Sequence, residues 1–130
     1  MSDPIGLIRR WLEILAAGTI GAWSEVVAAE ALFRFPYAPS GMDPRSVDEA
    51  RAAIGAFWTN IQSFEWNDVV IRGTEDPQLF LTIARSEALT ASGSRYANDY
   101  VMLTRIRNGR IVEHVEYFNP LVVQQLFAKP

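Results

Sequence analysis

Apolar residues recur at intervals of three and four in the first half of the chain, the pattern of helices with one buried face. From Pro4 to Gly18 this spacing predicts a helix that ends at the glycine. A shorter stripe over residues 22–27 predicts a second helix. Residues 50–61 predict a third, which Ser46 or Asp48 can cap.

After residue 63 the pattern changes to segments rich in β-branched and aromatic residues, which are typical of strands. An earlier strand is expected from Leu32 to Tyr37, running into a proline-rich loop. Four later strands are expected at Glu65–Arg72, Gln78–Leu89, Tyr96–Arg107 and Arg110–Phe118. A short helix from Pro120 to Phe127 closes the chain.

The turn between the last two predicted strands carries the strongest local signal. Asn108-Gly109 predicts a two-residue type I′ turn, because Asn and Gly both tolerate positive φ. The two strands are therefore expected to pair antiparallel. Counting outward from the turn places Leu103 opposite His114, and Val101 opposite Glu116.

This order of elements predicts one α+β domain over residues 1–130. Three N-terminal helices would pack against one face of a curved antiparallel sheet, giving a cone with a short C-terminal helix. A chain of 130 residues with 49% apolar content has enough material for one such core. Because the chain opens with a charged amphipathic segment rather than an apolar leader, we expect a cytoplasmic location.

Composition removes several classes of partner and cofactor from consideration. With 12 Lys and Arg against 15 Asp and Glu, the net charge is −3 and no basic run occurs. We therefore expect neither nucleic acid nor membrane as a partner. One histidine and no cysteine provide no metal ligand set, and no Gly-rich phosphate loop is present. Hence we expect no metal and no cofactor.

The chemistry to weigh lies in the last predicted strand. Since side chains alternate along a strand, His114 and Glu116 share one face, together with Val112 and Phe118. A histidine beside a carboxylate on an apolar wall can transfer protons, so both are candidate catalytic residues. A hydrogen-bonded structural histidine is the alternative for His114.

A candidate pocket is expected beside this pair. In the neighbouring predicted strand, Tyr96–Arg107, alternate side chains from Tyr96 onward share one face, which would suit a ligand. This face, with aromatic residues of the helices and the early strand, predicts an apolar cavity for a small apolar or aromatic molecule. The predicted substrate-binding residues are Trp11, Phe33, Phe35, Phe57, Trp58, Tyr96, Asn98, Tyr100 and Met102. The alternative is that these aromatic residues form ordinary core.

Three strings, in this order along the chain, carry a family resemblance: residues 10–20, the loop of residues 35–41, and residues 109–121. Together they resemble the nuclear transport factor 2-like superfamily, in its SnoaL-like and ketosteroid-isomerase-like branch, over nearly the whole chain. The resemblance implies the cone-shaped fold and a small-molecule-binding domain.

Within that branch, segments starting at Phe64, Glu75, Tyr96 and Glu116 resemble the small phenazine-biosynthesis proteins. The resemblance implies that Glu116 is an acid/base residue and that Tyr96 lines the pocket. However, the pocket histidine and serine of those proteins fall at Ala53 and Phe57 here.

The ketosteroid isomerases differ at more positions. Their helix tyrosine, general-base aspartate and oxyanion-binding acid fall at or near Trp11, Phe35 and Met102, all apolar. Without a base and both oxyanion donors in these places, their reaction is not inherited with the fold.

The expected function is a SnoaL-like small-molecule-binding domain that acts as a cofactor-independent isomerase or cyclase on a small apolar or polycyclic substrate. A non-catalytic ligand carrier or dimerisation module is one alternative, and an epoxide-type hydrolase is another. Apolar residues on the opposite face of the sheet predict a homodimer: Val101, Leu103, Val115 and Tyr117.

Overall fold

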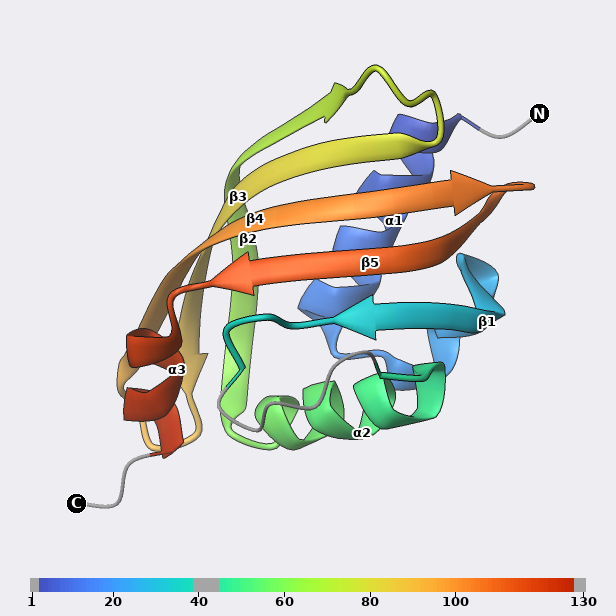
Figure 1. Ribbon diagram of the computed structural model, residues 1–130. Helices are drawn as coiled ribbons and strands as arrows, with labels where there is room; N and C mark the ends of the chain where they lie inside the picture. Colours follow the sequence, from blue (N-terminus) through green and yellow to red (C-terminus); the bar gives the residue numbers. More distant parts are fainter. Residues whose placement is uncertain (1–2, 39–44, 128–130) are drawn as a thin grey trace.

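A five-stranded sheet curves around two helices in the computed structural model, which describes residues 3–38 and 45–127 (Figure 1). The strand order is β1-β5-β4-β3-β2; β1 runs parallel to β5, and the other neighbours are antiparallel. This confirms the predicted α+β class. The elements are α1 (Pro4–Ala17), η1 (Ile20–Glu25), β1 (Val27–Arg34), α2 (Val47–Trp58), β2 (Ile61–Gly73), β3 (Leu79–Thr90), β4 (Arg95–Arg107), β5 (Arg110–Phe118) and α3 (Pro120–Phe127).

The two long helices begin and end where local chemistry requires. The Asp3 side chain accepts a hydrogen bond from the backbone N–H of Ile5 at the start of α1. The helix ends at Gly18, whose φ of 65° is available to glycine without steric cost. Ser46 and Glu49 form a reciprocal capping box at the start of α2, which confirms the predicted cap.

The region between these helices corrects two predictions. Residues 20–25 form the short 3₁₀ helix η1, whereas the predicted second helix extended to residue 27. Strand β1 starts at Val27 and ends at Arg34; the predicted strand ran from Leu32 to Tyr37. The cause is non-local, because Val27 pairs with Ile111 and Phe33 with His114 on β5. The end of the predicted third helix is also wrong, since Ile61 already belongs to β2.

The β4–β5 hairpin confirms the predicted turn and corrects the predicted register. Asn108 and Gly109 have φ of 53° and 73°, as a type I′ turn requires. One step later the register shifts: Ile106 pairs with Ile111, but Arg105 pairs with Glu113. Val112 is thus the extra residue of a β-bulge.

The bulge changes every pair beyond it. His114 lies opposite Thr104 rather than Leu103, and Glu116 lies opposite Met102 rather than Val101. Val112, expected on the face of His114, is displaced, and the fully buried Ile111 takes the inward position. Glu116 was predicted to face the pocket together with Tyr96 and Tyr100, and it does so only because the bulge shifts the register by one residue.

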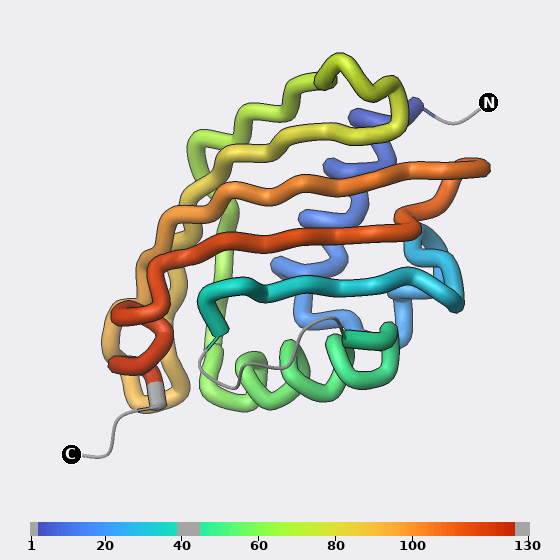
Figure 2. Tube along the Cα trace, in the orientation of Figure 1, coloured from blue at the N-terminus to red at the C-terminus, as the bar shows by residue number. Residues whose placement is uncertain are grey.

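Helices α1 and α2 lie on the inner side of the sheet, and α3 lies beside β4 (Figure 2). The main core joins α1, η1 and β1 through the fully buried aromatic residues Trp11, Trp23 and Phe33. None of the helices in the described residues is long and apolar enough to cross a membrane.

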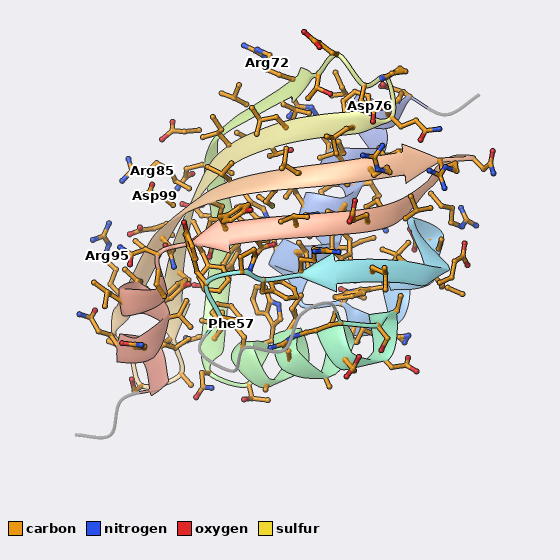
Figure 3. The ribbon with its side chains drawn as sticks, viewed as in Figure 1. Phe57, Arg72, Asp76, Arg85, Arg95 and Asp99 are labelled. Carbon is orange, nitrogen blue, oxygen red and sulfur yellow. The ribbon has the colours of Figure 1, made fainter. Side chains whose placement is uncertain are left out.

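The outer face of the sheet carries charges as well as apolar side chains. Arg85 and Asp99 form an exposed ion pair of 2.9 Å across β3 and β4, and Arg95 pairs with Glu87 nearby. Figure 3 shows these arginines projecting away from the helices, whereas Phe57 lies on the inner side, between α2 and the sheet.

Candidate functional site

A cavity of about 550 Å³ lies between α2 and the inner face of the sheet. Its volume is within the usual range for small-molecule sites. Helix α3 contributes Val123 and Gln124 to its wall. Most of the lining is aromatic or aliphatic, so the few polar groups in the wall determine what chemistry is available there.

Six of the residues predicted to form the site line this cavity: Phe35, Phe57, Trp58, Tyr96, Tyr100 and Glu116. They come from the segment after β1, from α2, from β4 and from β5. Strand alternation brings Tyr96 and Tyr100 to the inner face, and the bulge at Val112 brings Glu116 beside them.

Glu116 is held from behind by His114. The Nε2 atom of His114 lies 3.1 Å from Oε1 of Glu116, and the two side chains are 1% and 14% exposed. On the other side of the ring, Nδ1 lies 3.0 Å from the buried hydroxyl of Thr104. His114 does not line the cavity; it supports the carboxylate that does.

These contacts define a consistent arrangement of protons. When Glu116 is ionised it can only accept, so Nε2–H of His114 donates to Oε1; in the neutral imidazole Nδ1 is then an acceptor, and the hydroxyl of Thr104 donates to it. Both ring nitrogens are then satisfied with a neutral imidazole. Oε2 of Glu116 has no hydrogen-bond partner among the described residues, and this oxygen is left to face a ligand.

The second polar group is a pair of phenols. The hydroxyl oxygens of Tyr96 and Tyr100 lie 3.3 Å apart. The amide nitrogen of Asn98 donates to Tyr96 at 2.9 Å, and the hydroxyl of Ser86 donates to Tyr100 at 3.2 Å. Burial is the main cause that raises the pKa of Tyr96, and it raises the pKa of Tyr100 well above 10; the nearby charge of Glu116 adds to both shifts. Both phenols therefore remain neutral at physiological pH.

Ring contacts hold these groups in place. Phe57 packs edge-on against Tyr96 at 5.4 Å, and Trp66 packs edge-on against Tyr100 at 5.0 Å. The indole N–H of Trp66 donates to the carbonyl of Leu12 at 2.9 Å, which fixes the ring between α1 and the sheet. The phenols are thus supported by both rings and hydrogen bonds.

The other predicted binding residues lie behind the wall. Trp11, Phe33 and Met102 are at most 1% exposed, belong to the core and do not line the cavity. The rings of Trp11 and Phe33 instead enclose His114, at 5.7 and 5.8 Å. Asn98 is also behind the wall, where it holds Tyr96 and the backbone of Asn119.

Several lining residues were not among the predicted ones. Phe64 and Trp66 of β2 line the cavity, and their alternation around Glu65 was a usable sign that both face inward. Arg45 also lines it, 7% exposed, with its guanidinium 5.5 Å from the ring centre of Phe35. No periodic pattern surrounds Arg45, so its place was not readable from spacing.

Comparison with known proteins gives a consistent picture of the fold. The family model described as the SnoaL-like domain matches residues 8–114. An uncharacterized PhzA/B-like protein of Pseudomonas aeruginosa is 31% identical over 117 residues, which cover 85% of this chain and 79% of that protein.

Two solved structures are similar along almost their whole length. A candidate isomerase from Bacillus subtilis has a TM-score of 0.83 at 22% identity, covering 97% of this chain and 96% of its own. IdmH from Streptomyces antibioticus, described as a candidate polyketide cyclase, has a TM-score of 0.76 at 18% identity, covering 97% and 99%. The TM-scores show that these proteins share the fold of this chain, and at identities of 22% and 18% the similarity shows the fold alone.

Proposed function

Because the chain belongs to the SnoaL-like family, we propose that it is a cofactor-independent isomerase or cyclase that uses Glu116 to move a proton on a small apolar or polycyclic substrate. The observation that carries the proposal is the position of Glu116 on the cavity wall. One carboxylate oxygen is held by His114, and the other has no partner among the described residues.

The arrangement suits a general base. A carboxylate in a largely apolar cavity has little water to compete with a substrate, so its interactions with a bound molecule are strong. His114 fixes its orientation, and orientation is part of what makes proton transfer efficient. Such a group contributes roughly 100- to 10,000-fold in rate when it reaches the substrate proton.

The surrounding wall supports the proposed substrate class. Phe57, Trp58, Phe64 and Trp66 provide flat apolar surfaces that complement fused or single rings. The structural neighbours include proteins described as a candidate polyketide cyclase and a candidate isomerase, which agrees with this class of chemistry.

The test is hydrogen–deuterium exchange of 2-tetralone, a bicyclic ketone with acidic C–H groups beside its carbonyl. Loss of these proton signals in D₂O is followed by NMR. Wild-type protein should accelerate exchange over buffer, and Glu116→Gln should reduce that acceleration by about 100-fold or more. Glu113→Gln is the matched control, since Glu113 lies on the same strand but pairs with Arg34 and Arg105 outside the cavity.

Two results would count against the proposal. Exchange that is equally fast with Glu116→Gln would remove this residue from the chemistry. Binding of 2-tetralone by the wild type with no exchange above buffer would favour the ligand-carrier alternative.

A homodimer remains our proposal for the protein partner. Ile83, Val101 and Tyr117 lie side by side on the outer face of β3, β4 and β5. Ile83 and Val101 are 46% and 42% exposed, and together with Tyr117 they form one apolar patch. A contiguous apolar patch of this kind commonly marks a protein interface.

A further inference from the structure

The cavity wall carries a buried cation that the proposed proton transfer does not use. Arg45 lines the cavity and is 7% exposed. Its backbone N–H donates to the carbonyl of Phe33 at 2.7 Å, and its carbonyl accepts from the N–H of Phe33 at 2.8 Å. This pair of bonds joins Arg45 to β1 just before α2 begins. The fold therefore fixes the place of a positive charge beside the cavity.

The guanidinium of Arg45 lies next to a ring of the same wall. Its Cζ atom is 5.5 Å from the ring centre of Phe35, which also lines the cavity. An aromatic ring attracts a cation through the negative charge on its face, without the directional bonds that a carboxylate accepts. A guanidinium has five N–H groups in one plane. The contact with Phe35 thus holds the group beside the cavity without consuming these donors.

The charges of Arg45 and Glu116 act on different parts of the site. Burial is the main cause that raises the pKa of the two cavity phenols, and the charge of Glu116 adds to both shifts. At the start of α2, a hydrogen bond from the backbone of Ser46 is the main cause that lowers the pKa of Glu49, and the charge of Arg45 adds to that shift. The cation is therefore placed toward the start of α2, and the carboxylate toward β4 and β5.

We propose that the cavity takes an aromatic or polycyclic acid, and that Arg45 binds the carboxylate of this ligand and thereby selects the substrate class. The rings of the ligand occupy the apolar part of the cavity, and its reacting carbon faces Glu116. The inference rests on the proposed function, because it names the class of molecule that the same cavity would bind.

The surroundings of Arg45 favour an anionic partner. Phe35, Ala38 and Ile54 line the same cavity and are apolar, so they shield a bound carboxylate from bulk water. Two opposite charges attract each other several-fold more strongly in such a site than in water. A carboxylate also accepts two parallel N–H bonds from one guanidinium, which fixes the orientation of the ligand as well as its position.

The test compares 2-naphthoate with 2-naphthamide, which has nearly the same shape and no charge. Both ligands are titrated by calorimetry into the wild-type protein and into Glu116→Gln. In both proteins 2-naphthoate should bind roughly 10- to 100-fold more tightly than 2-naphthamide, as expected for hydrogen bonds to a charged group. The Glu116→Gln protein makes the comparison independent of any proton transfer by Glu116.

Substitutions of Arg45 should remove the preference in steps. Arg45→Met keeps an apolar stem and removes the charge, so the ratio of the two affinities should fall close to one. Arg45→Lys keeps the charge but cannot give two parallel bonds, so the ratio should fall several-fold and stay above one. Arg34→Met is the matched control: it removes the same charge from a residue that pairs with Glu113 outside the cavity, and it should leave the ratio unchanged.

Two results would overturn the proposal. One is equal affinity of the wild type for the two ligands, and the other is a preference for 2-naphthoate that survives Arg45→Met. If Arg45→Met does not fold, Arg45→Lys decides: its affinity for 2-naphthoate should fall several-fold while its affinity for 2-naphthamide stays the same. An unchanged affinity for 2-naphthoate would contradict a role for Arg45.

The outcome is separable from that of the exchange experiment with 2-tetralone. Selectivity for 2-naphthoate that depends on Arg45, without exchange of the ketone, would refute catalysis by Glu116 and retain the acid-binding site. Exchange that depends on Glu116, without selectivity for 2-naphthoate, would retain the catalytic carboxylate and refute the role of Arg45.

Discussion

Two buried threonines on the inner face of the sheet should respond in opposite ways to the same substitution. Thr82 and Thr104 are each 1% exposed and lie on neighbouring strands. The hydroxyl of Thr104 contacts Nδ1 of His114 at 3.0 Å. The hydroxyl of Thr82 is buried with no hydrogen-bond partner among the described residues. Replacing each by valine removes the hydroxyl and nearly preserves the side-chain shape.

The magnitudes follow from what each change leaves behind. Thr104→Val removes a buried hydrogen bond and leaves Nδ1 of His114 without a partner, which should lower the free energy of unfolding by roughly 1–3 kcal/mol. Thr82→Val removes a hydroxyl that is desolvated without compensation, and should raise the free energy of unfolding by about 1 kcal/mol. The two variants should therefore differ by roughly 2–4 kcal/mol.

Urea unfolding monitored by tryptophan fluorescence measures both changes, and equal slopes would show that the unfolded ensembles are comparable. A double-mutant cycle with His114→Phe isolates the Thr104–His114 contact, for which we expect a coupling energy of about 1–2 kcal/mol. Coupling near zero would refute the bond that orients His114. Destabilisation by Thr82→Val would show that its hydroxyl is satisfied after all.

Three further predictions concern the phenols, the outer face and the first helix. Burial raises the pKa of Tyr96 and Tyr100, so above pH 10 the folded protein holds more protons than the unfolded chain. The free energy of unfolding should therefore fall as the pH rises past 10. Absorbance at 295 nm should show a late tyrosine ionisation phase, which should be missing when both residues are replaced by phenylalanine. Val101→Lys should convert a dimer to monomer in sedimentation at low micromolar concentration, and an unchanged mass would exclude this face as the interface. Gly18→Ala should lower the free energy of unfolding by roughly 1–2 kcal/mol, because φ is 65°, whereas Gly21→Ala meets no neighbouring atom and should have little effect in the same urea assay.

The parts of the fold that sequence predicts well are those set by nearby residues. Gly18 ends α1, Ser46 caps α2 and Asn108-Gly109 turns the last hairpin because each acts through its own backbone conformation or its immediate neighbours. Strand β1 is different. Its residues include Ala28, Ala29, Glu30 and Ala31, which have no strong preference for strands. They lie between two points at which the strand pairs with β5, Val27 opposite Ile111 and Leu32 opposite Glu113, so distant residues hold the strand in place.

In the candidate site, too, the features set by nearby residues were predictable and those set by distant packing were not. The shared parity of His114 and Glu116 is a local property, and the structure does place them 3.1 Å apart. Whether they lie on the cavity wall or behind it depends on packing, so His114 is buried while Glu116 reaches the cavity. The alternation of Phe64 and Trp66 shows that both share a face of β2, but the contact of that face with Tyr100 depends on the curvature of the sheet, which sequence spacing does not reveal.

The bulge at Val112 shows why register is the hardest of these properties to obtain from sequence. Regular pairing outward from the turn places Glu116 opposite Val101, a residue of the outer face that is 42% exposed. One unpaired residue shifts the pairing by one, and a shift of one changes which face of the neighbouring strand each side chain meets. Glu116 then lies opposite Met102, which is 1% exposed, on the face that carries Tyr96 and Tyr100. The buried pair of His114 with Thr104 depends on the same shift, whereas the pairing of Ile111 with Ile106 comes before it. The bulge lets Ile111, before it, and His114, beyond it, both face inward, and the burial of both side chains favours the register that brings the carboxylate and the phenols to one cavity.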